Sequence, residues 1–375
     1  AADGNVLTFS PPRLPLPAPR RILLIKLRHH GDVLLATPVA HTLRRRFPDA
    51  KIDMLVYHET APMLAGNPDL HTVYTLNRQL RGLTKRRAEL SLGWQLYRQG
   101  YDWVIHLSDQ WNGAVLARLC GQQQGIGFDY PKRRTAPWAR LFTQLAPLAA
   151  SNTCHTVEQN LLSLTPLGIT AQGEERRCIM AIRPADQASV RLLLASLGVQ
   201  GEYLLVHPAS RWFFKCWEDD RFAEVIQTLA DAGHCLVLTC APDPQEVALV
   251  EAILQRVKSP RVHSLAGKLS LNTLAAAIDG ARLFLGVDSV PMHMAAALGK
   301  DTVALFGPSK VNEWRPWLTR YRLIHAADYG DLIDPDAVDT GTTERYLVNI
   351  PVAPVLAAVQ ALLALPPAAE NDDAA

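Results

Sequence analysis

The stretch from Leu283 to Pro308 reads LFLGVDSVPMHMAAALGKDTVALFGP, and it decides the fold that we predict for the chain. It opens with the apolar run 283–285, which is short and bounded by glycine, as buried strands of parallel sheets usually are. A helix is predicted over 290–298 and a second strand over 302–306. Together these elements form a βαβ unit, the building block of doubly wound sheets.

The start of the predicted helix is the part of this unit that is suited to bind a ligand. Ser289 is a good N-cap residue, and Pro291 falls in the first turn, where a missing N–H is tolerated. Free amide N–H groups at a helix start attract anions, and ligands of open α/β sheets bind at the carboxyl ends of the strands. An ordinary crossover without a ligand explains the pattern equally well.

Strands and helices alternate through the rest of the chain, which predicts an α/β fold with two sheets covered by helices on both faces. A length of 375 residues suggests two domains. The first clear strand is RILLIK at 21–26, and we place the domain boundary near Arg183 and Pro184. The expected segments are a flexible lead-in 1–20, a first domain 21–183, a second domain 184–350, a C-terminal helix 351–366 that packs back across both domains, and a disordered tail 367–375.

The small net charge of +2 hides a difference between the two halves. Residues 1–180 hold 22 Lys and Arg against 13 Asp and Glu, whereas the rest holds 16 against 23. A basic first half indicates an anionic partner, such as a phosphorylated sugar, nucleic acid or a lipid surface. For any single basic cluster a solvated face is the simpler interpretation. No apolar run is long enough to span a bilayer, so we expect a cytoplasmic protein.

Asp32 is the best-placed carboxylate of the first half. It follows the first strand, at the start of a short helical turn, and therefore lies at the carboxyl edge of the predicted sheet. Capping of that turn is the favoured interpretation. If a cleft lies over the edge, Asp32 is instead the best candidate for a general base.

The second half has polar residues at the matching edge. The loop 208–217, PASRWFFKCW, follows a predicted strand and carries Ser210 and Lys215, both natural partners of phosphate oxygens. Its aromatic residues are too apolar for a plain solvent loop. Asp288 could accept hydrogen bonds from a sugar hydroxyl or merely favour the helix start, and His293 is as well explained by burial as by a phosphate contact.

Several common signatures are missing from the sequence. GxGxxG after a strand, the phosphate-binding GxxxxGK[ST] and GxSxG do not occur, which argues against classical dinucleotide, P-loop and serine-hydrolase chemistry. The six cysteines show no CxxC or Cys/His spacing, so no metal site is predicted.

Three motifs in this order resemble the lipopolysaccharide heptosyltransferases, glycosyltransferase family 9. They are KLRHHGDVLLATPV near the start, the loop from Ser210 to Trp217, and GVDSVPMHMAAALG followed by ALFGPS. The form of the first motif is most similar to the heptosyltransferase III branch. The resemblance implies a GT-B architecture, in which two facing Rossmann-like domains enclose a cleft, with the acceptor on the first and ADP-heptose on the second.

The resemblance also assigns roles to single residues. It implies that Asp32 is the catalytic base, that Lys215 binds phosphate with catalytic effect, and that Ser210 contributes a hydroxyl contact. In the donor motif, Val290 replaces a smaller residue. The remaining implied donor-binding residues are Asp288, Ser289 and His293, with Leu269 against adenine and Asp243 or Glu246 at the ribose. Lys132, Arg133 and Arg134 are expected to hold the phosphorylated acceptor.

The activity implied is transfer of a heptose from ADP-L-glycero-D-manno-heptose to the lipopolysaccharide inner core with inversion. No cofactor is required on this interpretation, stimulation by Mg2+ is left open, and nucleic acid is not a partner. The protein would be cytoplasmic, with peripheral contact at the inner membrane. The alternatives are a sugar-nucleotide epimerase or hydrolase on the same scaffold, or a saccharide-binding protein without catalysis.

Overall fold

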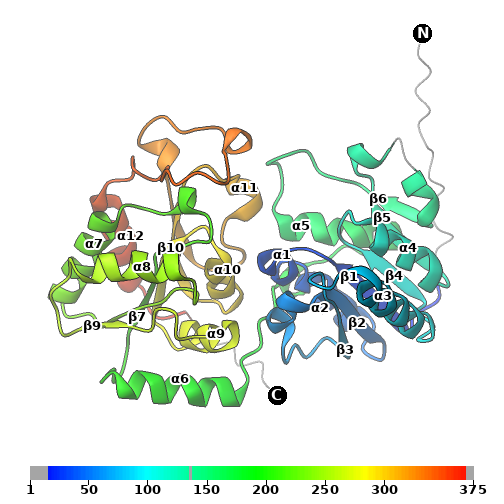
Figure 1. Ribbon diagram of the computed structural model, residues 1–375, viewed down its shortest axis with the longest axis horizontal. Coiled ribbons are helices and arrows are strands. Elements are labelled where there is room, and N and C mark those ends of the chain that lie inside the picture. The colour runs from blue at the N-terminus through cyan, green and yellow to red at the C-terminus, as the bar shows by residue number, and fades with distance from the viewer. Residues whose placement is uncertain (1–15, 135–136, 369–375) are drawn as a thin grey trace, which may run out of the picture. The chain divides into compact units, whose positions relative to one another are not determined.

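The computed structural model of the chain describes residues 16–134 and 137–368. Within this part the chain forms two compact units, which join between Ile179 and Met180 (Figure 1). The sequence pattern places the boundary a few residues later, near Arg183 and Pro184, where the first helix of the second unit begins.

Two of the expected segments reach beyond the described residues. Of the lead-in 1–20 the structure describes only residues 16–20, and of the tail 367–375 only residues 367 and 368. These described parts hold no helix or strand. The predicted flexibility of the two ends therefore falls mostly on residues outside the described ranges.

The first unit is built on a six-stranded parallel sheet with the order β3-β2-β1-β4-β5-β6. Its central strands are continuous apolar runs, as expected for a sheet that is covered on both faces. The strands are β1 (Arg21–Lys26), β2 (Lys51–Tyr57), β3 (Thr72–Leu76), β4 (Trp103–His106), β5 (Gln124–Phe128) and β6 (Gln144–Ala146).

Helices and 3-10 turns connect these strands in the alternating pattern that the sequence predicts. In chain order they are α1 (His30–Leu34), α2 (Thr37–Arg46), η1 (His58–Leu64), α3 (Gly82–Tyr97), α4 (Trp111–Cys120), η2 (Pro131–Arg133), η3 (Pro137–Leu141), α5 (Thr156–Leu161), η4 (Leu162–Leu167) and η5 (Gly173–Arg176). Helix α5 continues directly into η4, which ends at Gly168 with a φ of 74°. Positive φ is easiest for glycine, which explains the stop.

The second unit repeats the same sheet, with the order β12-β11-β10-β7-β8-β9 and all strands parallel. The predicted βαβ unit is confirmed as β10, α10 and β11, and Leu283 lies opposite both Leu204 of β7 and Asp301 of β11. The strands are β7 (Leu204–His207), β8 (Leu236–Leu238), β9 (Val262–Ser264), β10 (Leu283–Val287), β11 (Asp301–Phe306) and β12 (Tyr321–His325).

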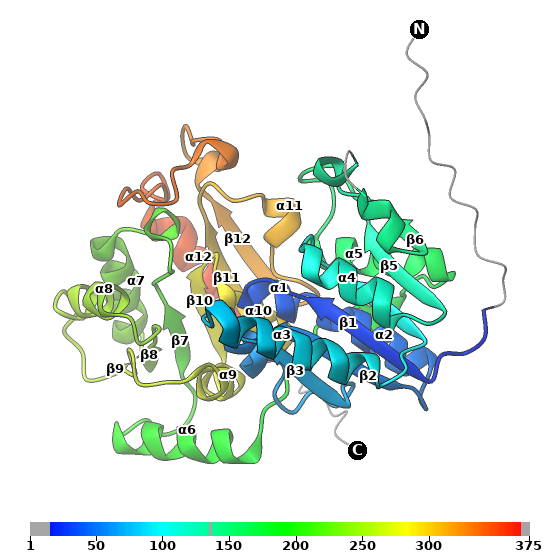
Figure 2. The same cartoon turned by 45° about the vertical axis from the view of Figure 1, so that its right-hand side comes forward.

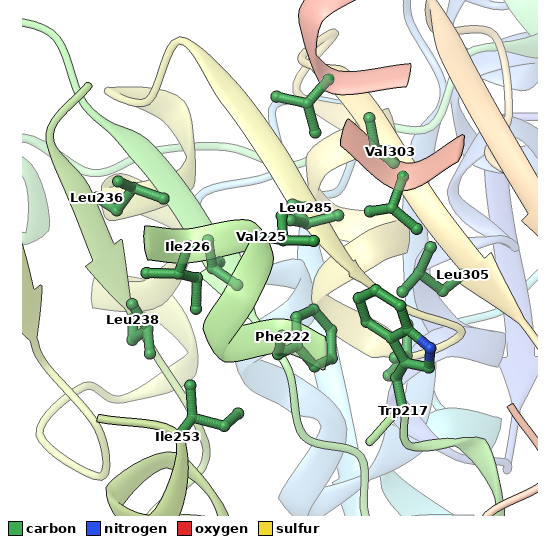
Figure 3. Close-up of a cluster of buried hydrophobic side chains, with 14 of the residues drawn as sticks. Trp217, Phe222, Val225, Ile226, Leu236, Leu238, Ile253, Leu285, Val303 and Leu305 are labelled. Carbon is green, nitrogen blue, oxygen red and sulfur yellow. The ribbon is translucent and has the colours of Figure 1, made fainter. Parts of the chain in front are cut away.

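One face of this second sheet is covered by α7, α8 and α12. Figure 3 shows Phe222, Val225 and Ile226 of α7 against side chains of β8, β10 and β11, with the buried Trp217 beside Phe222. The helices and 3-10 turns of the unit are α6 (Pro184–Ser196), η6 (Phe213–Lys215), α7 (Asp219–Asp231), α8 (Pro244–Leu254), α9 (Leu271–Asp279), α10 (Val290–Ala297), α11 (Val311–Trp314), η7 (Ala326–Asp328), η8 (Pro335–Ala337) and α12 (Val352–Leu363).

The expected C-terminal helix over 351–366 is present as α12 and is part of the core of the second unit. Its buried side chains Val355, Val359 and Leu362 join the same apolar cluster as α7 and the strands. It packs against α7, β10, β11 and β12. Within the described residues no helix is long and apolar enough to cross a membrane.

Counted within each unit, both sheets have the strand order 3-2-1-4-5-6, which is the order of dinucleotide-binding Rossmann folds. Connections leave the central strands in opposite directions, between β1 and β4 in the first unit and between β7 and β10 in the second. Ligands of such sheets bind in the crevice at the carboxyl ends of these strands. The fold therefore points to the loops after these four strands.

At the amino ends of the strands of the second sheet, the buried Asp301 is bonded to two arginines. Its carboxylate accepts a bond of 2.6 Å from Nη1 of Arg282 and another of 2.6 Å from Nη2 of Arg320. Burial raises the pKa of the Asp301 carboxyl, but the two arginines outweigh burial and hold it below its ordinary value. This group is fully paired and anchors the start of β11.

We expect Asp301→Ala to lower the free energy of unfolding by about 3 to 5 kcal/mol at pH 7, because Arg282 is left buried without its partner. A carboxyl whose pKa is lowered in the folded state stabilises above its unfolded pKa, and this contribution is lost as the pH falls through the folded pKa. The difference should therefore shrink below about pH 4. Urea unfolding at both pH values tests this, with the exposed Glu202→Ala as control, and an unchanged midpoint at pH 7 would refute it.

Candidate functional site

The loops after β7 and β10 are joined by a buried ion pair. Nζ of Lys215 lies 2.9 Å from Oδ2 of Asp288, and the same oxygen accepts a 2.7 Å bond from the hydroxyl of Ser309. The Asp288 side chain is only 5% exposed, and that of Lys215 is 23% exposed. Lys215 is therefore a fixed cation at the carboxyl edge and not a loose surface lysine.

The electrostatics of this edge favour a charged Asp288. Burial alone would raise the pKa of its carboxyl, but the charges of Lys215 and His293, with the bonds from Ser309 and Lys215, hold the pKa below its ordinary value. An ammonium has three N–H donors, and within the described residues Lys215 uses one of them, toward Asp288. The pair thus keeps two donors for a ligand.

Ser289 occupies the N-cap position of α10, but it does not make the capping hydrogen bond expected of a serine there. Its backbone is extended, with a φ of −161°, and its side chain makes no capping bond. The hydroxyl is buried and has no hydrogen-bond partner among the described residues. Pro291 stands in the first turn as predicted, and Val290 is the first helical residue. The start of α10 therefore offers free amides and an unused hydroxyl.

The other residues of this edge are held by local contacts. His293 is buried one turn into α10, with its ring centroid 6.1 Å from that of Trp314. Ser210 is also buried, and its hydroxyl accepts a 3.2 Å bond from the amide of Trp212, which shapes the loop. Ser309 was missed by the sequence analysis as a site residue, although it closes the motif ALFGPS.

The three residues expected near adenine and ribose are held by contacts separate from the Lys215–Asp288 pair. Asp243 caps α8 through the amides of Gln245 and Glu246. Glu246 is largely buried, and burial raises the pKa of its carboxyl, with a smaller effect from Asp243. Leu269 is buried as well. Within the described residues none of the three forms a hydrogen bond or ion pair with Lys215 or Asp288.

In the first unit, Asp32 is buried and caps α1. Its Oδ2 accepts a 3.3 Å bond from the amide of His29 and lies 3.8 Å from Nε of Arg28. The favoured interpretation as a cap is thus confirmed. The cap uses one carboxylate oxygen, and within the described part of the chain no bond to the other is seen. Capping therefore does not use both oxygens of the Asp32 carboxylate.

Lys26 is a buried cation beside Asp32 that the sequence analysis missed. Its Nζ donates to the carbonyl of Leu107 at 2.9 Å and to Oδ1 of Asn160 at 3.1 Å. Burial lowers the pKa of Lys26 to about 8, while the charge of Asp32 opposes that fall. A lysine at the end of the apolar run RILLIK is the signal that could have identified it.

The basic residues 132–134 are largely neutralised within the unit. Lys132 forms an ion pair with Asp109, and Arg134 forms two bonds with the carboxylate of Asp129. The pKa of the Asp109 carboxyl is held below its ordinary value, because the Lys132 contact outweighs the effect of burial.

Arg133 is different, because its partners are a carbonyl and two aromatic rings. Its Nη2 donates to the backbone oxygen of Asp109 at 2.7 Å. Its guanidinium lies 4.9 Å from the ring centre of Trp111 and 5.4 Å from that of Trp138. Trp138 is buried, whereas 37% of Trp111 is exposed. Arg133 thus keeps its charge next to an exposed aromatic ring.

Within residues 16–134 and 137–368, no group of three or more His, Cys, Asp or Glu side chains is arranged to hold a metal ion.

Known proteins resemble the chain in sequence and in fold. The family model described as glycosyltransferase family 9 (heptosyltransferase) matches residues 89–340. "Lipopolysaccharide heptosyltransferase 3" of Escherichia coli is 39% identical over 90% of this chain and 97% of that protein. A family 9 glycosyl transferase from Veillonella parvula has a similar fold, with a TM-score of 0.78, 22% identity, and coverage of 92% and 97%. The structure of E. coli heptosyltransferase WaaC with ADP has a TM-score of 0.69 and 20% identity, and the match covers 91% of this chain and 99% of that one.

Removing the Lys215 ammonium should destabilise the second unit, because it pairs with the buried Asp288. We expect Lys215→Met to lower the free energy of unfolding by about 2 kcal/mol at pH 7, because the buried Asp288 carboxylate loses its main partner. Adding Asp288→Asn should recover most of the loss. Chemical unfolding of both single variants and the double variant measures this coupling. The exposed Lys268→Met serves as control, and purely additive effects would contradict the pairing.

Proposed function

The chain belongs to glycosyltransferase family 9, the heptosyltransferases, and on that premise we propose that it moves a heptose from ADP-L-glycero-D-manno-heptose to the inner core of lipopolysaccharide. The chain is thus a glycosyltransferase, and the similarity along nearly the full length of the E. coli enzyme favours the type 3 acceptor. The single structural observation that supports the donor class is the Lys215–Asp288 pair beside the start of α10.

The donor is assigned to the second unit. In the proposed reaction the bond between the anomeric carbon and the diphosphate breaks, and ADP leaves with the electron pair. Two N–H donors of Lys215, the hydroxyl of Ser289 and the amides at the start of α10 would meet the developing charge. Ser210 and His293 also follow β7 and β10, and Val290 at the start of α10 is bulkier than the small residue usual in the family motif.

The acceptor is assigned to the first unit. Asp32 would take the proton of the acceptor hydroxyl as its oxygen attacks the anomeric carbon from the side opposite to ADP. A single in-line displacement of this kind inverts the configuration at that carbon. Lys26 is buried in the same region, where its Nζ donates to the carbonyl of Leu107 and to Oδ1 of Asn160.

Arg133 and Trp111 are proposed to hold the phosphorylated core saccharide. The guanidinium can form paired bonds with a phosphate, and the exposed indole can pack against the apolar face of a sugar ring. Lys132 and Arg134 are already paired with carboxylates and would contribute less.

The remaining proposals concern conditions and place. The reaction written above balances without a cofactor, so none is proposed, and stimulation by Mg2+ acting on the diphosphate is left to experiment. Because the acceptor is carried by a lipid, we propose that the enzyme works in the cytoplasm in peripheral contact with the inner membrane.

We expect Asp32→Asn to lower kcat by about 10² to 10⁴, the usual effect of losing a positioned base. Asparagine still accepts the bond from the amide of His29, so the cap of α1 and the fold should be kept. Affinity for ADP should not change. Steady-state kinetics and calorimetric titration with ADP test this, with the exposed Asp49→Asn as control. Full turnover by Asp32→Asn would show that another group takes the proton.

We expect Arg133→Met to raise KM for the phosphorylated acceptor at least about tenfold, as for the loss of a charge-assisted bond. Arg134→Met should change it less than about twofold, because that guanidinium is paired with Asp129. Initial rates at saturating donor measure both. Equal effects of the two substitutions would rule out a special role for Arg133.

A further inference from the structure

Helix α3 exposes an unusual number of large apolar side chains. Leu83, Leu90, Trp94 and Tyr97 are 70%, 75%, 62% and 55% exposed. At about 100° per residue the four positions fall within about 60° of one another, so they form one stripe along the helix. The rings of Trp94 and Tyr97 are stacked, with centroids 5.9 Å apart. We refer to these four residues as the α3 stripe.

The α3 stripe is not needed to attach the helix to its unit. On the opposite side of the helix, Leu96 is fully buried and Leu92 packs against the core of the first sheet. Gly93 lies against Leu116 of α4, which runs next to α3 (Figures 1 and 2). The helix therefore has one apolar face for the core and a second one for solvent.

The neighbouring helix α4 also exposes apolar residues. Val115 and Leu119 are 44% and 60% exposed and stand four residues apart, on one face of α4. Isolated exposed apolar residues are ordinary, but four large ones in one stripe along a helix mark an interaction surface.

Basic residues border the α3 stripe. On the helical wheel Arg86 and Arg87 fall on its two sides, and within the described residues neither guanidinium has a hydrogen-bond or ion-pair partner. Residues 81–98 hold five Lys or Arg against one acidic residue, Glu89, which lies 4.0 Å from Lys85. The surface is thus apolar in its centre and positive around it.

We propose that α3 docks in the surface of a membrane that contains anionic lipid. The α3 stripe enters the boundary between headgroups and acyl chains, where Trp and Tyr are favoured, and the basic residues contact the acidic headgroups. The inference rests on the proposed function, because that membrane carries the lipid-linked acceptor. Docking would raise the encounter rate between the enzyme and its acceptor.

Charge favours a membrane over a second copy of the chain as the occupant. In a symmetric dimer through this face, the same patch meets itself, so Arg86 and Arg87 of both copies would approach one another. Like charges in an interface are unfavourable, whereas an acidic lipid surface complements them.

Sedimentation with vesicles tests the proposal. The probes are phosphatidylcholine vesicles with and without about one third of phosphatidylglycerol, at low and high salt. We expect the protein to bind the anionic vesicles and Leu90→Glu/Trp94→Glu to weaken this binding at least about tenfold. Leu192→Glu on α6 is the control, because Leu192 is also exposed, at 74%, but belongs to the second unit and not to the α3 stripe. Both changed residues of α3 are exposed, so folding should be kept, which circular dichroism verifies.

Activity separates this proposal from the proposed function. With a deacylated, water-soluble acceptor the double variant should match the unchanged protein, and with the acceptor inserted in anionic vesicles it should be at least about fivefold slower. No transfer to the soluble acceptor by any form would refute the proposed function, while the vesicle result would still stand. Equal vesicle binding by the double variant, or a dimer in ultracentrifugation that the double variant dissociates, would overturn the docking proposal.

Discussion

Parallel pairing of β1 with β4 and of β7 with β10 is the constraint on which both candidate site regions depend. In each unit the chain leaves these two strands toward opposite sides, so the loops after them border the crevice in which such sheets bind ligands. Asp32 follows β1, and Asp109 follows β4. Lys215 follows β7, and Asp288 follows β10, so the pair that they form is a direct result of the strand order.

Buried charged groups are paired differently at the amino and carboxyl ends of the strands of the second sheet. At the amino edge, Asp301 is bonded to both of its arginines, and its role is structural. At the carboxyl edge, Lys215 has donors to spare, and the hydroxyl of Ser289 is buried with no bond to the described residues. Burying polar groups without full pairing costs free energy, and such incomplete pairing is what a binding edge requires.

Much of this arrangement could be predicted from the sequence, because periodicity reports burial. The apolar runs predict the strand over 21–26 and the βαβ unit after Leu283 almost to the residue. They also predict that Asp32 and Lys215 follow the carboxyl ends of strands, as they do after β1 and β7. Residues 125–150 could not be assigned, since β5 contains two glycines and β6 has only three residues. Contacts between distant residues were also out of reach. No local pattern shows that Lys132 meets Asp109 or that Ser309 meets Asp288.

The most direct test of the whole account is mass spectrometry of a purified lipopolysaccharide inner-core acceptor after incubation with the protein and ADP-heptose. We expect the acceptor to gain the mass of one heptose and ADP to be released in equal amount. Nuclear magnetic resonance of the product should show the anomeric configuration opposite to that of the donor. Release of free heptose, an epimerised donor, or an acceptor of unchanged mass would contradict the assignment as a heptosyltransferase.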